Sequence, residues 1–451
     1  MSQDADVAVR WSTAERVAAL KQIVPKSAIG VVLRNCGQGT APCRRLPRWF
    51  VVWFVIAMAL FCRDSDQQVF RWLHRFRKGG TPGRSTLCEA RRSVGVAPLR
   101  LLAEQVIQLQ ARPGTPQAFY RGMRLMGVDS FVVDVPDTPA NERAFGRPGS
   151  GRSPGAFPQA RVLSLCELGT PVLWKSLIKP HRRGEHPMAR HILRFLEENR
   201  LLLWDRNFLS FDLVRQVRAR HAHLLVRVKS NLIFTPTQRL RDGSFLAKRY
   251  PSPRHRARDE GGVVVRIIEY MFDDPNRPGT GQTHRLLTTL LDERQHPAKD
   301  LIVRYHERWE QELAYDELKT HQRERPVRHS QTPGGVVQEL YGLLLGHFVI
   351  RKLMCDAAEQ ADVAPRQLSF VNTLKILRCR LPEAPRSASG LRRWHQQLLT
   401  EVAAELLEPR RNRIHPRVIK RKMTNWLKKR DKHRNSPQPT KTFRKSIVML
   451  D

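Results

Sequence analysis

The sequence predicts an α/β core that follows a helical N-terminal part and precedes a basic C-terminal tail. Three observations predict it. Apolar residues recur at three- and four-residue steps up to about residue 112, the period of amphipathic helices. From Leu125 the chain changes to short β-branched runs separated by turns. From Pro333 it is mainly helical again, with VVQELYGLLLGHFVIRKLM as the clearest apolar helix.

The N-terminal residues 1–112 contain several apolar runs that predict helices, among them WFVVWFVIAMALFC, QQVFRWLHRF and VAPLRLLAEQVIQLQ. The run from Trp49 to Cys62 has fourteen residues, short of the ~20 that a membrane-spanning helix needs. We therefore expect a buried helix there. The pattern is compatible with an Arg-rich DNA-binding module and equally with a dimerisation or purely structural bundle.

The order of elements in residues 120–230 predicts a ribonuclease-H-like layer. Three strands (GVDSFVVDVP, ARVLSLCEL, TPVLWKSLI) are followed by helix HPMARHILRFLEEN, strand NRLLLWD, helix FDLVRQVRAR and strand AHLLVRVK. A β-rich insertion is expected over 231–297, and residues 298–400 complete the core with helices. Residues 401–451 form the basic tail, expected to be helical or disordered.

The charge of the chain indicates a polyanionic partner. The 79 Lys and Arg against 42 Asp and Glu give a formal net charge of +37. Nucleic acid fits best, because Lys and Arg that neutralise phosphates release counterions and so supply affinity. The segment from Arg410 to Lys445 alone carries fifteen Lys or Arg and one acid, Asp431. It is expected to clamp DNA electrostatically.

Cysteine usage and the first residues indicate the compartment. The seven cysteines are scattered, without a CxxC pair that could bind zinc, and imply a reducing environment. The stretch from Met1 to Leu20 lacks the apolar core of a secretion signal. We expect a soluble, cytoplasmic protein that does not associate with membranes.

The segment DLIVRYHERWEQELAYDELKTHQ has no Gly or Pro and predicts one long helix. At 100° per residue, one arc of about 60° holds Tyr305, Arg308, Glu312 and Lys319. The opposite side, expected to face solvent, holds Glu307, Glu310 and Glu317. Asp316 shares the first face, so either it or Glu312 could hold a metal ion. An ordinary surface helix with i,i+4 ion pairs is the alternative.

The spacing Tyr-x2-Arg-x3-Glu-x6-Lys resembles the signature of the insertion-sequence-four family of bacterial DDE transposases. The surroundings are similar too: HRLLTTLLD precedes it and RHSQTPGGVVQELYGLLLGHFVIRKLM follows it. Upstream, VDSFVVDVPDTPANERAFGRPGSGRSPGAFPQARVLSLCELGT resembles the family's first acidic segment and LLLWDRNFLSFDL its second. The resemblance spans about residues 45 to 360.

The resemblance implies that Asp129, Asp205 and Glu312 form the catalytic, metal-binding triad. Two Mg²⁺ ions are expected, with Mn²⁺ able to substitute, because Mg²⁺ takes few protein carboxylates. The sequence departs from the family at Ser130 and Asn207, where members often have Gly, and this bears on local turn geometry. Rival first acids are Asp134, which strand alternation puts on the other face, and Asp137, expected to cap a turn.

The resemblance implies cut-and-paste transposition: metal-dependent cleavage at transposon ends and strand transfer into target DNA. Tyr305, Arg308 and Lys319 would contact the DNA, and the chain would act as a homodimer on double-stranded DNA near the bacterial nucleoid. If a hairpin forms at the DNA end, Tyr250, Tyr270 or a Phe would stack on a flipped base. Alternatives are a metal-dependent nuclease without strand transfer, a tyrosine recombinase and a basic packaging protein.

Overall fold

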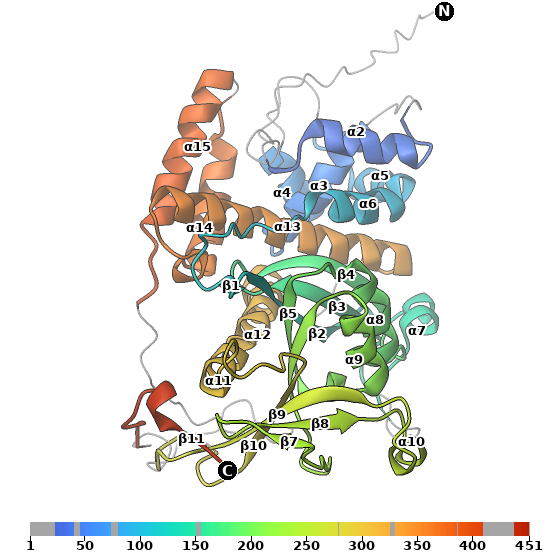
Figure 1. Ribbon diagram of the computed structural model, residues 1–451. Coiled ribbons are helices and arrows are strands. Elements are labelled where there is room, and N and C mark those ends of the chain that lie inside the picture. The colour runs from blue at the N-terminus through green and yellow to red at the C-terminus, as the bar shows by residue number, and fades with distance from the viewer. Residues whose placement is uncertain are drawn as a thin grey trace, which may run out of the picture. The chain divides into compact units, whose positions relative to one another are not determined.

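A computed structural model describes residues 23–39, 46–73, 80–149, 155–277, 279–324, 330–385, 387–408 and 437–450 (Figure 1). The chain forms two compact units. Unit 1 comprises Met1–Phe195 and Trp309–Leu406, and unit 2 comprises Leu196–Arg308 and Leu407–Asp451. The division expected from the sequence, at residues 112, 230, 297 and 400, stays a prediction.

The described N-terminal part of unit 1 is helical, as the periodicity predicts. Its helices are α2 (Lys26–Asn35), α3 (Arg48–Leu60), α4 (Asp66–Leu73), α5 (Arg84–Val94) and α6 (Ala97–Val106). Helix α3 is buried on nearly every side, with Trp53, Ile56 and Leu60 fully covered. The expectation of a buried helix is therefore confirmed. Over the described residues, no helix is both long and apolar enough to cross a membrane.

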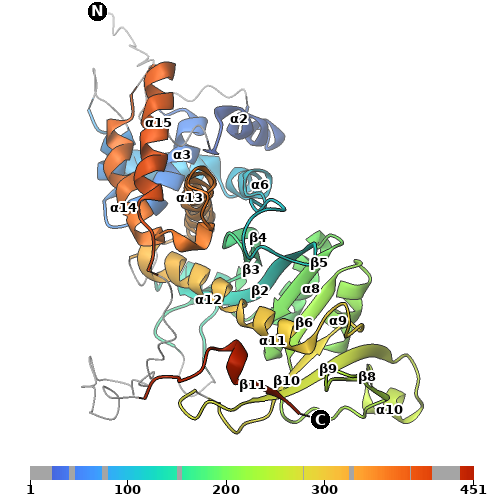
Figure 2. The same cartoon turned by 60° about the vertical axis from the view of Figure 1, so that its left-hand side comes forward.

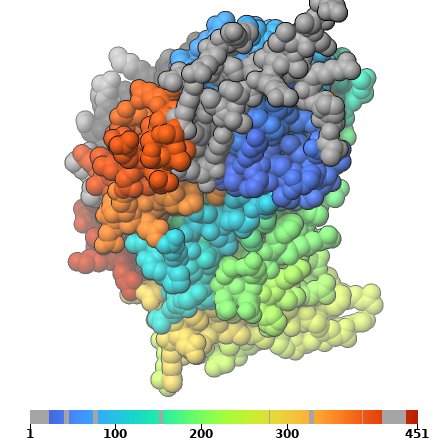
Figure 3. Space-filling model, turned by 90° about the horizontal axis from the view of Figure 1, so that it is seen from above, coloured from blue at the N-terminus to red at the C-terminus, as the bar shows by residue number. Residues whose placement is uncertain are grey.

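The long helix α13 (Pro333–Gln360) organises the helical part of unit 1. It packs against α3, α6, α14 (Phe370–Arg380) and α15 (Ala388–Ala403), and Figure 2 shows it end-on among them. A Cβ atom on Gly342 would lie 2.8 Å from the carbonyl oxygen of Val55. Only glycine therefore allows α13 and α3 to approach this closely. In the view from above, α15 lies in orange to the left of the blue N-terminal helices (Figure 3).

Unit 1 also contains an antiparallel sheet in the order β4-β3-β2, with β1 beside β2. The strands are β1 (Phe119–Tyr120), β2 (Met123–Asp134), β3 (Gln159–Glu167) and β4 (Val172–Pro180). Helix α7 (Pro139–Phe145) connects β2 to β3, and α8 (Glu185–Ile192) with the 3-10 turn Leu193–Phe195 packs on β3 and β4. Strand β4 ends the order, so its outer edge is open.

The strands of unit 2 follow the order β5-β6-β10-β9-β8-β7. Strands β5 (Arg200–Trp204) and β6 (His223–Arg227) are parallel, with α9 (Phe211–Arg218) between them in sequence. The other strands are β7 (Gln238–Arg239), β8 (Phe245–Arg249), β9 (Val263–Phe272) and β10 (His284–Thr288), and the unit's other helices are α10 (Pro253–Ala257) and α11 (Ala298–His306). The order of strands and helices expected for a ribonuclease-H-like core is confirmed.

The β-rich stretch extends the sheet of unit 2 and forms no layer of its own, because β10 pairs with both β6 and β9. The end of the basic tail also departs from the expectation of helix or disorder. Strand β11 (Ile447–Met449) pairs antiparallel with β9, and Lys441 donates from its backbone to Asp274 at 2.9 Å. These hydrogen bonds offset the conformational entropy that is lost when the end of the tail becomes ordered. The basic residues from Arg410 to Arg434 lie outside the described residues.

Candidate functional site

The segment carrying the Tyr-Arg-Glu-Lys spacing is not one straight helix. Helix α11 ends at His306, a turn covers residues 307–308, and α12 (Trp309–Asp316) is followed by a π-helical turn (Glu317–Gln322). The ideal-wheel geometry is therefore wrong beyond one helix. Tyr305 and Arg308 belong to unit 2, whereas Glu312 and Lys319 belong to unit 1.

Asp129 lies in the middle of β2, opposite Ser164 of β3. Its Oδ1 accepts a hydrogen bond from the Ser130 backbone N–H at 2.7 Å, and its carbonyl oxygen accepts one from the Tyr315 hydroxyl at 2.5 Å. Phe131, on the same face of β2, packs on Tyr315 with ring centroids 4.7 Å apart. The face of β2 that carries Asp129 is thus held against α12.

Ser130 points to the other face of β2, as strand alternation requires. Its hydroxyl donates to Glu185 of α8 at 2.5 Å and accepts from Arg161 at 3.0 Å, and Arg161 pairs with Glu185 at 2.9 Å. Serine in place of the family's glycine therefore adds a hydrogen bond between the sheet and α8. It does not alter the strand that positions Asp129.

The rival first acids have other partners. Asp134, the last residue of β2, accepts a hydrogen bond from Gln159 at 2.8 Å, and the exposed Asp137 pairs with Arg147. The expected capping role of Asp137 is wrong. Thr138 caps α7 instead, because its hydroxyl accepts from the Asn141 N–H at 3.2 Å.

Glu312 is half-buried on α12, between two residues that tie this helix to the sheet. Gln311 donates from Nε2 to the Ser164 carbonyl oxygen and to the Tyr315 hydroxyl, both at 3.1 Å. A Cβ atom on Gly127 of β2 would lie 2.2 Å from Gln311 Oε1. A glycine at this position lets the amide of Gln311 lie against the strand.

Tyr315 keeps its proton over a wide pH range. Burial, reinforced by the neighbouring Asp129 carboxylate, raises the pKa of the Tyr315 hydroxyl well above its ordinary value. The hydroxyl therefore remains a donor to the Asp129 carbonyl oxygen. Both Gln311 and Tyr315 were missed by sequence reasoning. Tyr315 lies one turn after Glu312, and its place at the edge of the same helical arc is the signal that could have identified it.

The opposite side of the segment does not face solvent, contrary to expectation. Glu310 is 5% exposed. The Glu317 carboxylate forms an ion pair with Arg351 of α13, and its Oε2 lies 3.2 Å from Nε2 of His347 on the same helix. Burial opposes ionisation of Glu317, but Arg351 and the hydrogen bond from His347 lower its pKa below the ordinary value. Glu307 pairs with Arg304 in unit 2 at 2.7 Å. Packing against α13 explains the burial of Glu310 and Glu317.

Lys319 and Asp316 follow Glu312 along the chain. Lys319 is exposed, and its Nζ lies 5.9 Å from the ring centroid of Phe131, two residues beyond Asp129. Asp316 is exposed too; it accepts from the Thr320 hydroxyl at 2.7 Å and lies 3.6 Å from His321.

In unit 2, Asp205 directly follows β5 and opens the 3-10 turn Arg206–Phe208. Asn207 lies inside this turn and does not have a positive φ. Glycine is therefore not required at position 207, and the departure leaves the turn unstrained.

Tyr305 lies near Asp205, and Arg308 lies near the Tyr305 ring. The Tyr305 hydroxyl donates to the carbonyl oxygen of Trp204 at 2.9 Å, and the Arg308 guanidinium carbon is 6.0 Å from the Tyr305 ring centroid. Burial raises the pKa of Tyr305 to about 12, with Arg308 and Arg227 opposing the shift and Asp205 adding to it. Arg227, at the end of β6, is a further cation of this cluster that sequence reasoning missed.

Two family models match this chain. A family model described as insertion element 4 transposase N-terminal matches residues 14–104, and one described as transposase DDE domain matches residues 120–348, just over half of the chain. The chain belongs to the insertion-sequence-four family of DDE transposases. It is therefore a transposase, which excludes the tyrosine recombinase and the packaging protein.

Two relatives from Escherichia coli (strain K12) are similar to this transposase. Transposase InsG for insertion sequence element IS4 is 27% identical over 431 residues, which are 93% of this chain and 96% of InsG. Putative transposase InsZ is 27% identical over 196 residues, 42% of this chain and 64% of InsZ. A cryo-EM structure of the piggyBac transposase synaptic complex with hairpin DNA aligns over 89% of this chain and 87% of that one, at 13% identity and a TM-score of 0.43.

The transposase distributes its candidate residues over both units. In unit 1, Asp129 lies on β2, Glu312 on α12 and Lys319 in the π-helical turn that follows. In unit 2, Tyr305 lies near Asp205 and Arg308 lies near the Tyr305 ring. Over its described residues, neither unit gathers three or more His, Cys, Asp or Glu side chains that could together hold a metal ion.

Of the aromatic residues considered for base stacking, Tyr270 is unsuitable because it is only 6% exposed and packs against Phe272 and His284. Tyr250 is half-buried, and its hydroxyl donates to Asp259 at 2.6 Å. The role stays a prediction.

Proposed function

We propose that this transposase cleaves DNA at transposon ends and transfers the released strand into target DNA, using Asp129, Asp205 and Glu312. The observation that carries the proposal is the grouping of the family's signature residues with the candidate acids. Tyr305 lies close to Asp205 and carries Arg308 against its ring, and the helix of Glu312 is bonded to the strand of Asp129.

The three proposed ligands suit Mg²⁺. All are carboxylates and half-buried, and hard divalent cations prefer oxygen ligands. When bound, two Mg²⁺ ions, or Mn²⁺ in their place, would activate the attacking hydroxyl or water and stabilise the leaving oxygen. The protein's own part is to present the acids on elements fixed by packing, with Asp129 on β2 and Glu312 on α12.

The cations of the signature would hold the DNA. Arg308 is half-buried near the Tyr305 ring, and its guanidinium can bind a phosphate through two hydrogen bonds. Lys319 is exposed and offers a compact charge to a second phosphate. Tyr305 is held in place by its bond to the Trp204 carbonyl oxygen, so its ring supports Arg308.

Substitution of Asp205 separates chemistry from binding. Asp205→Ala removes a proposed metal ligand but none of the positive charge that holds phosphate. We expect both Mg²⁺-dependent cleavage and strand transfer to be lost, while affinity for transposon-end DNA is kept. Retained cleavage by the purified variant would remove Asp205 from the triad. Cleavage by the wild type without joining to a target would reduce the function to that of a nuclease.

Glu312 and Asp316 provide a matched pair on one helix. Glu312→Gln should eliminate cleavage, whereas Asp316→Asn should keep most of it, because Asp316 is exposed and bonded to Thr320. Both variants must retain the wild-type circular dichroism spectrum and end-DNA affinity. An inactive Asp316 variant together with an active Glu312 variant would move the third ligand by one turn.

The proposed partners are double-stranded transposon ends and target DNA, with two copies of the chain assembled on the DNA in the bacterial cytoplasm. The net charge of +37 supports a DNA partner. Light scattering of the complex with end DNA tests the dimer, and a mass of one chain per complex would exclude it.

A further inference from the structure

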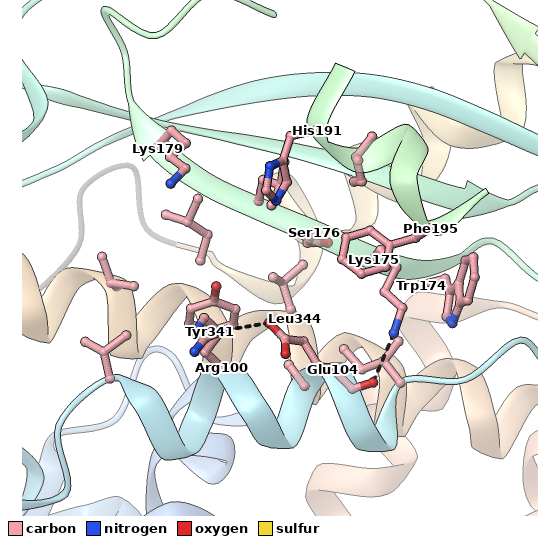
Figure 4. A pocket seen from close by; sticks show the side chains of 17 residues that line it. Arg100, Glu104, Trp174, Lys175, Ser176, Lys179, His191, Phe195, Tyr341 and Leu344 are labelled. Atoms are coloured by element: carbon pink, nitrogen blue, oxygen red, sulfur yellow. Dashed lines mark hydrogen bonds and ion pairs between the residues drawn. The ribbon is translucent and has the colours of Figure 1, made fainter. Parts of the chain in front are cut away.

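A groove of about 530 Å³ runs along the open edge of β4 in unit 1 (Figure 4). Six consecutive residues of β4, from Trp174 to Lys179, line it, and α6, α8, the turn after α8 and α13 supply the other walls. None of its lining residues belongs to the proposed triad or to the signature. The groove is therefore separate from the catalytic residues.

A β-bulge shapes one end of the groove. Leu165 pairs with Lys175 and Cys166 pairs with Leu173, so Trp174 is an extra residue in β4. A bulge re-aims side chains that would otherwise alternate across the strand. It allows the neighbours Trp174 and Lys175 both to line the groove. The Trp174 Nε1 is buried without a hydrogen-bond partner among the described residues.

The walls of the groove carry more positive than negative charge. Three cations, Arg100, Lys175 and Lys179, line it with one acid, Glu104. Glu104 pairs with Arg100 at 2.8 Å, and its backbone carbonyl oxygen accepts from Lys175 Nζ at 3.1 Å. Both lysines lie on β4 four residues apart, which is about 13 Å along a strand. Two phosphates of one DNA backbone can be contacted over that length.

An exposed aromatic ring lies beside these charges. Phe195 is 40% exposed, and its ring centroid is 5.6 Å from Lys175 Nζ. A basic groove with an accessible aromatic ring is the usual arrangement for binding unpaired nucleic-acid strands, because bases stack on the ring while Lys holds the backbone. The volume of the groove is within the range of small-ligand sites, about 300–1,000 Å³, and suits nucleotides of a single strand better than a duplex.

We propose that this groove binds an unpaired strand of DNA, with phosphates on Lys175 and Lys179 and a base against Phe195. The inference rests on the DNA partner of the proposed function but concerns a different surface. A second copy of the chain is a poorer occupant of the open edge, because pairing β4 with itself brings lysines together. Lysines on an edge strand can also serve only to prevent such pairing. The experiment distinguishes this protective role from phosphate binding.

The test measures binding of the full-length chain to oligothymidylate by fluorescence anisotropy over a range of salt concentrations. The double variant Lys175→Gln, Lys179→Gln should lower the slope of log affinity against log salt by about 1.4, since each phosphate contact on a single strand contributes about 0.7. Phe195→Ala should weaken binding by about 5- to 140-fold with little change in slope. The control, Lys248→Gln with Lys352→Gln, removes two lysines that lie outside the groove and pair with Asp259 and Asp356.

An unchanged slope and affinity in the double variant would overturn the proposal. Self-association of that variant with an unchanged slope would also overturn it and assign the lysines to protection of the edge. End cleavage by the wild type is scored separately. If the wild type does not cleave end DNA while the groove variants still bind oligothymidylate more weakly, the proposed function is rejected and the assignment of the groove to single-strand binding stands.

Discussion

Replacing Tyr315 by Phe tests whether the tie between α12 and β2 serves catalysis. The change removes one hydroxyl, which donates to the Asp129 carbonyl oxygen at 2.5 Å and accepts from Gln311 at 3.1 Å. The ring and its contact with Phe131 remain. The substitution therefore loosens the strand of Asp129 relative to the helix of Glu312 without creating a cavity.

The expected loss of stability follows from the two partners. Gln311 Nε2 keeps its second acceptor, the Ser164 carbonyl oxygen, so only the Asp129 carbonyl oxygen loses its side-chain donor. Loss of one such hydrogen bond costs about 0.5–1.5 kcal/mol, and in a unit of this size each kcal/mol lowers Tm by about 2–4 °C. Misplacement of a catalytic group by about 1 Å can reduce the rate by about 100-fold. We expect a folded variant whose cleavage rate falls by at least about 10-fold, because the acids are displaced by a fraction of that distance.

The assay is single-turnover cleavage of transposon-end DNA over a range of Mg²⁺ concentrations, with end-DNA affinity measured in parallel. If Tyr315 positions the acids, Tyr315→Phe will need more Mg²⁺ for half-maximal rate while binding DNA normally. Tyr250→Phe is the matched control, because it removes a phenol hydrogen bond of 2.6 Å to Asp259 in unit 2. A Tyr315 variant with reduced Tm but wild-type rate and Mg²⁺ dependence would refute the positioning role.

Three further outcomes are expected. Arg351→Met should destabilise the protein by about 3–5 kcal/mol in thermal melts, because it leaves Glu317 buried without its cation; a loss below about 1 kcal/mol, the value of an exposed pair, would contradict this. Since the folded-state pKa of Glu317 is lowered, its contribution is present above the ordinary carboxyl pKa and is lost as pH falls through the folded value, so the wild type should lose this stability in the acid range, whereas the variant, which lacks the cation that lowers the pKa, should not. Gly127→Ala should reduce both Tm and cleavage, because its Cβ would lie 2.2 Å from Gln311 Oε1; normal values would show that the Gln311 amide can move away. Replacing the Lys and Arg between Arg410 and Arg434 by Gln should lower the salt dependence of duplex binding, and an unchanged slope would show that this segment does not contact DNA.

The chemistry-bearing residues could be predicted from the sequence because the information is local. Four signature residues at fixed spacing and an acid directly after an apolar strand are visible without tertiary contacts. The strands and helices of residues 120–230 were predictable for the same reason, since period-2 and period-3.6 patterns record which face of each element is buried. The buried helix at Trp49 to Cys62 follows from its length and apolar character alone.

The interruption of the signature helix could not be predicted from the sequence. Local propensity favours one continuous helix there, and the break at residues 307–308 and the π-helical turn at Glu317–Gln322 override it. The buried pair of Glu317 and Arg351 joins residues 34 positions apart. No helical wheel contains such a partner, so a wheel places Glu317 in solvent.

The sequence by itself determined the family, the candidate acids and the charge that calls for a nucleic-acid partner. Only the tertiary structure decided which side chains support those acids: Tyr315 and Gln311 on α12, Gly127 on β2, and Arg227 beside Tyr305. It also decided that the end of the tail becomes strand β11 and that a bulge at Trp174 opens a basic groove. The physical reason is that these features depend on contacts between segments distant in sequence, where burial and hydrogen-bond satisfaction outweigh local preference.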